Sequence, residues 1–454
     1  MSIYDYIIVG GGISGLFTAY KLADTGHKIL IVESTNRWGG RIYTKKEKGV
    51  QYELGAGRVS SKHTKLMSLI KELDLDKDLL PLPSKINYKI KGSKVNFYSL
   101  VKELIDGSKL YTKKYLQSVN LLQLCIDVLG QEGAIHFKHK LGYDSEFEHL
   151  QAHHCLRSFK KDLFSATEYF VMKHGLSSIT DKLVSILQEK DNITLELECS
   201  VTDIGKNYIQ VDKHKKYGAT ILCCVPYQSL KSFPKFKDVS EIDTVEPIPL
   251  IRIYAKYPKD KNGKVWFHNL PRTITDNYIR HIIPIDYESG LIMISYTDGL
   301  YADMWSNLSK VGNKVLLEHL HKEVKVVLGK TPPKPDFITS YYWSAGVHMW
   351  KPGHNVNEVY EKIMKPFDKE KIYIINEAYS KHQSWIEGSL DISYDVLEMI
   401  DPKFKRNKPK KGGSKKRDSK GKKRISNVYT IQQVLKKRNW IVLDIKGKLR
   451  IYDV

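Results

Sequence analysis

Three glycines near the start of the chain have the spacing of a dinucleotide-binding loop. Gly10, Gly12 and Gly15 follow an apolar run that ends at Val9, and they precede a stretch with apolar residues at helical spacing. In such a loop the first glycine allows a tight turn, the second lets the backbone approach a pyrophosphate, and the third lets the helix meet the sheet. Glu33 ends the next apolar run, where its carboxylate would accept hydrogen bonds from ribose hydroxyls and repel a 2′-phosphate. The pattern predicts a dinucleotide site and disfavours NADP.

Four further motifs follow this loop. Residues 37–41 read RWGGR, in which two glycines leave bare backbone between two fixed cations, an arrangement suited to phosphate oxygens. ELGAGR occupies residues 53–58, NEA at 376–378 ends an apolar run, and WIEGSL at 385–390 opens a helical pattern. A second clamp for phosphate beside the glycine loop indicates FAD rather than NAD.

Taken together, these motifs resemble those of the flavin-containing amine oxidase family, which includes monoamine, polyamine and L-amino-acid oxidases. The resemblance extends over residues 3–400 in the family's order and spacing. ELGAGR followed by SSKHTKLMSLIKELDL is most similar to the L-amino-acid oxidase branch. The stretch IRIYAKYPKDKNGKVWF also resembles amine oxidases encoded by large DNA viruses. One departure is Asn376, where the family usually has glycine before the glutamate that Glu377 provides.

The resemblance implies an FAD site. The glycine loop would hold the pyrophosphate, Glu33 the adenosine ribose, Val201 the adenine, and the ELGAGR and WIEGSL motifs the flavin ring. The monoamine oxidases carry a flavin-linking cysteine in the loop that aligns with residues 344–353, and this chain has none there, so we expect FAD to be bound non-covalently. The implied cofactor-binding residues are Gly10, Gly12, Ile13, Ser14, Gly15, Glu33, Ser34, Gly40, Arg41, Gly55, Ala56, Gly57, Arg58, Val201, Glu377, Ser384, Trp385, Ile386, Glu387, Gly388 and Ser389.

The same resemblance implies oxidation of an amine or an L-amino acid. Hydride would pass from the α-carbon to flavin N5, water would hydrolyse the imine, and oxygen would be reduced to hydrogen peroxide. Trp385 would flank the substrate on one side, with His348 or Trp350 on the other, although Trp350, like Trp343, could equally be a core residue. Arg58 would pair with the substrate carboxylate, or it would only support the flavin.

Arg252 stands where many family members have a lysine that assists oxygen activation. Because arginine stays protonated, it cannot act as a base. From their positions in the family's motifs, the expected catalytic residues are Arg252, Trp385 and His348. Either oxygen or another acceptor would take the electrons. The alternatives are a dehydrogenase, a non-catalytic flavoprotein tethered to nucleic acid by a basic tail, and a desaturase or protoporphyrinogen-oxidase-like protein. We expect no metal site, since the cluster His153–Cys155 is more simply structural.

The elements that must position these residues alternate between strands and helices. Apolar runs predict strands at residues 6–9, 29–33, 249–257, 290–296 and 372–376, and several short strands within 193–225. Helical spacing predicts helices across 96–170, at 307–328 and at 385–400, whereas 341–353 is expected to be an aromatic loop. The predicted fold is α/β, with a Rossmann-type FAD-binding domain and a sheet-and-helix substrate domain. The FAD-binding domain would comprise 1–85, 171–235 and 340–400, and the substrate domain 86–170 and 236–339.

The composition is that of a globular protein of 454 residues with an excess of positive charge, +22. Residues 403–424 hold 13 Lys and Arg against one acid, so we expect a basic linker over 401–426 that could bind a polyanion such as nucleic acid. Residues 427–454 resemble the start of a cytochrome b5-like domain without its haem-binding motif. Five irregularly spaced cysteines, no signal peptide and no apolar run of about 18 residues predict a cytoplasmic protein without a membrane span. If the gene is viral, the protein would lie in the host-cell cytoplasm or the virion.

Overall fold

The computed structural model describes residues 3–92, 95–162, 167–404, 440–445 and 448–453, and the chain divides into two units, 1–405 and 406–454. In the second unit, β19 (Trp440–Ile445) and β20 (Lys448–Asp453) form an antiparallel pair. Most of the predicted basic linker lies outside the described residues. The same holds for most of the segment that resembles cytochrome b5, so the structure leaves both predictions untested.

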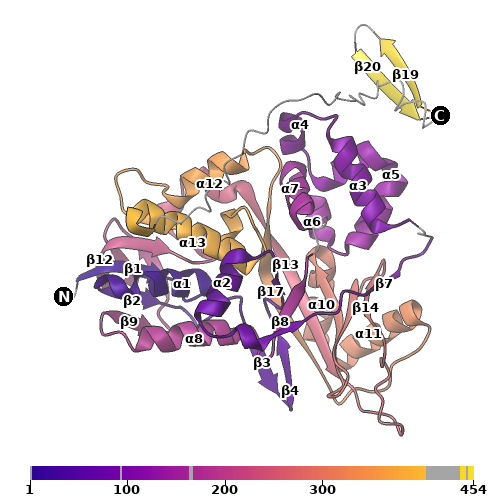
Figure 1. The fold of residues 1–454 in the computed structure, drawn as a ribbon, viewed down its shortest axis with the longest axis horizontal. Coiled ribbons are helices and arrows are strands. Elements are labelled where there is room, and N and C mark those ends of the chain that lie inside the picture. Colours follow the sequence, from indigo (N-terminus) through magenta and orange to yellow (C-terminus); the bar gives the residue numbers. More distant parts are fainter. Residues whose placement is uncertain (1–2, 93–94, 163–166, 405–439, 446–447, 454) are drawn as a thin grey trace, which may run out of the picture. The chain divides into compact units, whose positions relative to one another are not determined.

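A seven-stranded sheet carries the N-terminal strand, turn and helix (Figure 1). Its order is β10-β11-β12-β1-β2-β9, with β18 beside β12. β1 pairs in parallel with both β2 and β12, as a Rossmann-type sheet requires. The strands are β1 (Ile3–Val9), β2 (Ile29–Val32), β9 (Ile193–Glu196), β10 (Val201–Ile204), β11 (Tyr208–Val211), β12 (His214–Cys223) and β18 (Ile372–Ile374).

Helices cover both faces of this sheet, which explains why its central strands are continuously apolar. Ile8 packs in one core with α1 (Ile13–Leu22), α2 (Thr64–Glu72), α8 (Ser177–Gln188) and α13 (Ile386–Ile400). Its neighbours Ile7 and Val9 point to the opposite core, which includes α9 (Tyr227–Ser232) and α12 (Val356–Met364). This alternation with period two is the expected geometry of a strand buried on both faces.

A second sheet of six strands has the order β17-β13-β16-β15-β14-β7. Ile251 and Ile253 of β13 pack on α10 (Gly299–Val311) and α11 (Asn313–Leu328), so the alternate residues Leu250 and Arg252 face the other way. The strands are β7 (Ile86–Lys89), β13 (Val245–Lys256), β14 (Arg272–Thr275), β15 (His281–Asp286), β16 (Leu291–Asp298) and β17 (Phe337–Trp350).

Two expectations from the sequence are wrong in this region. The predicted aromatic loop is the strand β17, which pairs with β13 along its length and therefore lies in the second sheet, not with the cofactor sheet. Part of this strand, including Trp343, lines a cavity. The predicted helix over 307–328 is two helices, since Gly312 has φ +139° and interrupts the helical backbone.

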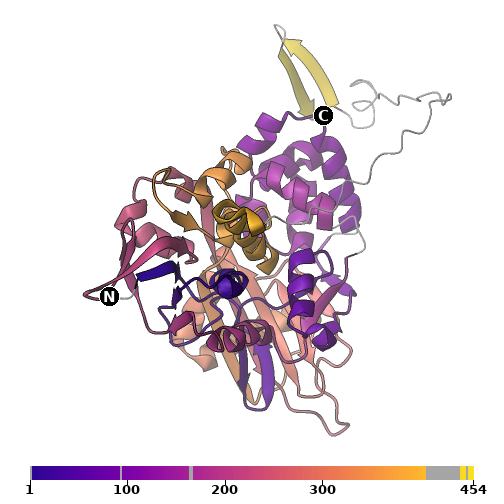
Figure 2. The ribbon, with the colours of Figure 1, turned by 60° about the vertical axis from the view of Figure 1, so that its left-hand side comes forward.

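Helices that were expected within residues 96–170 form a block beside these sheets (Figure 2). They are α3 (Phe97–Ser108), α4 (Lys113–Ser118), α5 (Leu121–Leu141), α6 (Asp144–His149) and α7 (Ala152–Asp162). Asn96, Thr112 and Asn120 cap the first three by accepting a backbone N–H. Small sheets are formed by β3 (Thr44–Glu47) with β4 (Val50–Glu53), and by β5 (Val59–Ser60), β8 (Tyr169–Met172) and β6 (Leu79–Pro81). Among the described residues, every helix is too short or too polar to span a bilayer.

Candidate functional site

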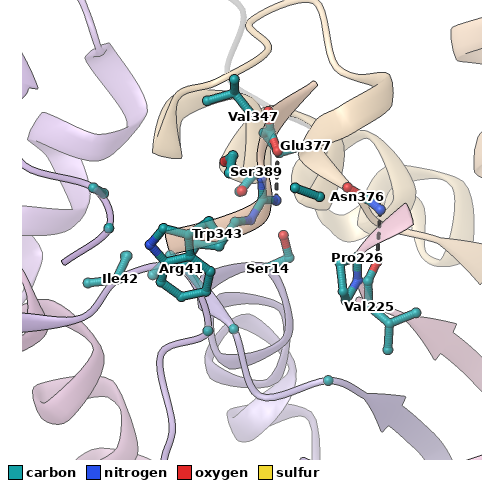
Figure 3. A pocket seen from close by; sticks show the side chains of 18 of the residues that line it. Ser14, Arg41, Ile42, Val225, Pro226, Trp343, Val347, Asn376, Glu377 and Ser389 are labelled. Carbon is teal, nitrogen blue, oxygen red and sulfur yellow. Dashed lines mark hydrogen bonds and ion pairs between the residues drawn. The ribbon is translucent and has the colours of Figure 1, made fainter. Parts of the chain in front are cut away.

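One cavity of about 640 Å³ brings the sequence motifs together (Figure 3). Its walls come from the glycine loop, the RWGGR and ELGAGR motifs, the NEA segment, the start of α13 and the cavity-facing side of the second sheet. The predicted cofactor-binding residues that line it are Gly10, Gly12, Ile13, Ser14, Glu33, Ser34, Gly40, Arg41, Gly55, Ala56, Gly57, Arg58, Val201, Glu377, Ser384, Trp385, Ile386 and Ser389.

The three glycines of the loop each meet a different steric demand. Gly10 has φ +108°, and a Cβ there would lie 2.6 Å from the carbonyl oxygen of Cys224. A Cβ on Gly15 would lie 2.0 Å from the carbonyl oxygen of Gly10, so the helix can approach the strand only without a side chain. A Cβ on Gly12 would have no protein atom closer than 4.0 Å, and the residue lines the cavity. No side chain caps α1, so its first N–H groups are available to an anion.

Glu33 fixes the loop at the end of β2. Its Oε2 accepts the backbone N–H of Gly11 at 2.8 Å, and its Oε1 accepts the backbone N–H and the hydroxyl of Thr35 at 2.9 and 2.8 Å. The carboxylate lines the cavity on the side where Cys199, Ser200 and Val201 lie. Its position suits a ribose next to an adenine that contacts the backbone of Val201.

The RWGGR turn packs directly on the glycine loop. The backbone N–H of Gly39 donates to the carbonyl oxygen of Gly11 at 2.9 Å. Gly40 has φ +55°, and a Cβ there would lie 3.2 Å from the Cα of Gly12. The two arginines have different roles. Arg37 donates to the carbonyl oxygen of Gly40 at 2.6 Å and braces the turn, whereas Arg41 extends along the cavity wall.

Arg41 forms an ion pair with Glu377, in which Nη2 lies 2.7 Å from Oε2 (Figure 3). Glu377 is only 4% exposed, and its Oε1 also accepts the backbone N–H of Ser384 at 2.5 Å. Burial alone raises the pKa of Glu377, but Arg41, His348 and the Ser384 N–H lower it to about 2. The pair therefore connects the RWGGR turn to the loop before α13 with a carboxylate that stays ionised.

Glu377→Gln is expected to lower the free energy of unfolding at pH 7 by about 3 kcal/mol, because Arg41 loses its buried counter-ion. The folded pKa of Glu377 lies below its ordinary value of 4.5, so the pair's stabilisation is complete above about pH 4.5 and is lost as the pH falls towards 2. Urea unfolding of both proteins at pH 7 and pH 3 measures this difference, which should shrink at the lower pH. Glu361→Gln, at an exposed position, is the matched control. Equal stability of Glu377→Gln and wild type at pH 7 would contradict the argument.

At the other end of the cavity, Arg58 lies among aromatic rings. Its guanidinium is 5.0 Å from the ring centre of Tyr169 and 5.4 Å from that of Trp385, and these two rings stack on each other. Its Nη2 donates to the hydroxyl of Tyr143 at 3.4 Å. Within the described part of the chain, Arg58 has no carboxylate in ion-pair distance. A guanidinium in this setting is suited to an anion that enters the cavity.

Arg252 reaches the same end from β13. Its Nη1 donates to the carbonyl oxygen of Glu53 at 2.9 Å, and its guanidinium lies 5.0 Å from the ring centre of Tyr296. A Cβ on Gly57 would lie 2.8 Å from this Nη1, so the glycine lets the arginine pack closely against the ELGAGR backbone without shifting. Burial lowers the pKa of Arg252, but Tyr254 and Tyr296 raise it more, so the cation persists. It can bind and orient, and it cannot accept a proton.

Five predicted site residues lie away from the cavity. His348 and Trp350 are fully buried: His348 lies behind Arg41 with its Nδ1 3.7 Å from Oε2 of Glu377, and the indole of Trp350 donates to the carbonyl oxygen of Ser380. Both are core residues, because alternate side chains of a strand point to opposite faces and these two point away from the cavity. Gly15, Glu387 and Gly388 serve packing instead. Glu387 accepts the backbone N–H groups of Lys65 and Leu66 and so holds the start of α2.

Trp343, for which the sequence left pocket and core equally open, lines the cavity and donates its indole N–H to the carbonyl oxygen of Leu54 at 2.8 Å. The cavity also contains residues that the sequence did not single out. Tyr296 is paired with Arg252 across β16 and β13, and Tyr143 precedes α6. Behind Tyr143 lies Arg272. No motif marks these residues, and only knowledge of the strand register would have placed Tyr296 next to Arg252.

The geometry fits FAD, the cofactor that the motifs imply. The uncapped start of α1 and the open side of Gly12 suit the pyrophosphate, and Glu33 with Val201 suits the adenosine end. The opposite end, between the ELGAGR backbone and the WIEGSL turn, has the glycine backbone and the aromatic walls that a flat ring system requires. Each half of the dinucleotide therefore has a matching part of the cavity wall.

Comparison with known proteins agrees with this geometry. The family described as "Flavin containing amine oxidoreductase" matches residues 13–390. An L-amino-acid oxidase from Siganus canaliculatus is 30% identical over 192 residues, which make up 41% of this chain and 33% of that protein. The flavin-containing amine oxidase B of Rattus norvegicus is 36% identical over 94 residues, 20% of this chain and 18% of that protein. These matches span about one third or less of the relatives' length, and they give no support to a nucleic-acid partner.

A solved structure of putrescine oxidase bound to putrescine has the same fold. It matches with a TM-score of 0.69 over 88% of this chain and 99% of that one, at 14% identity. Identity this low shows the fold alone, and it confirms the predicted α/β architecture. The family match over residues 13–390 is the decisive finding, because it contains every motif that lines the cavity except the first glycines. The chain therefore belongs to the flavin-containing amine oxidoreductase family.

Proposed function

We propose that the protein carries out FAD-dependent oxidation of an L-amino acid. The observation that carries this proposal is Arg58, a guanidinium in the cavity wall next to Trp385 that has no carboxylate partner among the described residues. A cation in this position has a clear use when the substrate brings a carboxylate, and a simple amine would leave it unpaired.

Bound FAD would supply the two-electron oxidation: a hydride from the substrate α-carbon would reduce it, oxygen would take the electrons and become hydrogen peroxide, and water would hydrolyse the imine to a 2-oxo acid and ammonia. The protein's own residues orient the substrate. Arg58 binds the carboxylate in a two-pronged contact, and the rings of Trp385, Trp343 and Tyr296 enclose the space and exclude water. Arg41, fixed by Glu377, supports the phosphate side of the cofactor.

The presence of Arg252 supports a second candidate function, in which the electrons pass to an acceptor other than oxygen. This residue is a permanent cation locked between the Glu53 carbonyl and Tyr296, so it cannot exchange protons during the reaction with oxygen. A slow reaction with oxygen would make the protein a dehydrogenase that uses another acceptor.

The proposed function is tested by mixing the purified FAD-bound protein with L-amino acids and with amines under anaerobic conditions and recording loss of the flavin absorption band. We expect L-amino acids, not their decarboxylated amines, to bleach it. Reoxidation with oxygen and with an artificial acceptor then separates an oxidase from a dehydrogenase. If no amino acid or amine bleaches the flavin, the proposed function is wrong.

Acid precipitation is expected to release intact FAD from the protein, because residues 344–353 contain no cysteine that could link to the flavin. After precipitation and centrifugation, the supernatant should contain stoichiometric FAD by absorbance and chromatography, and the pellet should be colourless. A yellow pellet would reveal a covalent link formed elsewhere in the chain.

A further inference from the structure

We propose that Tyr143, with Arg272 behind it, forms a second carboxylate-binding position beside Arg58, so that the preferred substrates are L-amino acids with an acidic side chain. This inference rests on the proposed function and specifies its substrate class. The second position is built from residues of two separate elements, the segment before α6 and strand β14.

The geometry centres on one phenol. The hydroxyl of Tyr143 accepts hydrogen bonds from Nη2 of Arg58 and from Nη2 of Arg272, both at 3.4 Å. In the described part of the structure, this hydroxyl donates to no protein acceptor, and Tyr143 lines the cavity. A phenol that receives two hydrogen bonds from cations and still has its own proton to give is a strong donor to an anion.

The spacing of the two cations suits a dicarboxylate. Because each guanidinium nitrogen lies 3.4 Å from the same oxygen, the two nitrogens are at most about 7 Å apart. The two carboxyl carbons of glutamate are about 5 Å apart when its four C–C bonds are extended. One carboxylate at Arg58 therefore leaves the other within reach of the Tyr143 hydroxyl, which lines the cavity and is backed by Arg272.

The positive charge of this region is not balanced by protein carboxylates. Neither Arg58 nor Arg272 has an ion-pair partner among the described residues, and the buried Nε of Arg272 lacks a hydrogen-bond acceptor. The ring of His281 lies 5.0 Å from that of Tyr143 between centres, and its pKa shows the effect of this excess positive charge. Burial and then Arg272, Arg280 and Arg58 hold the pKa of His281 well below its ordinary value. An uncompensated cationic site is expected where the ligand supplies the anion.

Two acidic residues in the cavity wall, Asp298 and Glu146, would be the alternative anchors for a cationic side chain. Asp298 is poorly suited, since its two oxygens accept the backbone N–H groups of Asp144 and Ser145. Burial and the nearby Asp144 raise the pKa of Asp298 to about 7, so near neutral pH it carries only part of its charge. Glu146 already takes part in an interaction within the protein, and at the Tyr143 hydroxyl Arg58 and Arg272 outweigh both burial and its charge, since the pKa of Tyr143 is lowered. The balance of the site therefore favours an anionic side chain.

The test uses unreactive ligands on the FAD-bound protein, so it does not depend on turnover. Glutarate has two carboxylates, pentanoate has one at the same chain length, and 1,5-diaminopentane carries two cations. Dissociation constants are measured from the change in the flavin absorption spectrum and by calorimetry. We expect wild type to bind glutarate at least about tenfold more tightly than pentanoate. Arg272→Gln should remove this preference and leave pentanoate binding unchanged.

Tyr143→Phe is the second variant and should also reduce the preference, by removing the hydroxyl donor. Arg157→Gln, which removes an exposed arginine on α7, is the matched control for loss of charge and should behave as wild type. The FAD content of each variant shows that it is folded. Three results would overturn the proposal: equal affinity of wild type for glutarate and pentanoate, equal weakening of both ligands by Arg272→Gln, or tighter binding of 1,5-diaminopentane than of glutarate.

Failure of this inference can be told apart from failure of the proposed function. If neutral L-amino acids bleach the flavin but glutarate is not preferred, only the second carboxylate position is wrong. If glutarate is preferred but no amino acid bleaches the flavin, the anion site stands and the proposed oxidation is wrong.

Discussion

Arg58→Met is expected to lower kcat/KM for an L-amino acid by about 30- to 1000-fold while FAD content stays unchanged. The range corresponds to roughly 2–4 kcal/mol for a charge-assisted, two-pronged contact with the substrate carboxylate. Arg58 has no carboxylate partner among the described residues, so its removal breaks no buried ion pair in the free protein. The measurement is kcat/KM, with the acceptor that works best, for the amino acid and for its decarboxylated amine.

Two comparisons show what Arg58 does. Arg58→Lys should recover little activity, because lysine keeps the charge and loses the planar fork. The decarboxylated amine should be a poor substrate of wild type and should change little in Arg58→Met. If wild type prefers the amine, or if Arg58→Met impairs both substrates equally, then Arg58 supports the flavin and not the carboxylate. Oxidation of simple amines would then be the better proposal.

Gly15→Ala is expected to cost several kcal/mol of unfolding free energy and to prevent recovery of FAD-bound protein. An added Cβ would lie 2.0 Å from the carbonyl oxygen of Gly10, so α1 would have to move away from β1. Because the clashing atom is a backbone carbonyl oxygen rather than the end of a flexible side chain, no small adjustment relieves the clash. Chemical denaturation and the yield of yellow protein measure this effect.

Gly12→Ala separates binding from folding. Gly12 has φ −74°, which alanine adopts without strain, and no protein atom lies closer than 4.0 Å to an added Cβ. We expect this variant to fold with nearly wild-type stability and to bind FAD at least about tenfold more weakly, since the methyl group occupies the space of the pyrophosphate. Stability equal to wild type in Gly15→Ala, or full FAD affinity in Gly12→Ala, would contradict the roles assigned to these glycines.

The glycine loop could be recognised from the sequence because its constraints are local. Positive φ at Gly10 and the close approach at Gly15 exclude other residue types within a few positions, so the requirement is visible in the residue types themselves. The same holds for the buried strand around Ile29–Val32 and for Gly40 in the RWGGR turn. Arg58 was identified from its place in the ELGAGR motif that the chain shares with the family, in which Gly55 packs against the backbone of Arg41.

Only the tertiary structure decided which side chains reach the substrate end of the cavity. Along β17, Val347 and Met349 line the cavity whereas His348 between them is fully buried, because alternate side chains of a strand point to opposite faces. Arg252 meets Tyr296 through the register of β13 and β16, and Tyr143 meets Arg272 through the packing of two distant elements. These contacts depend on strand register and on long-range packing, and no local preference of these residues encodes them.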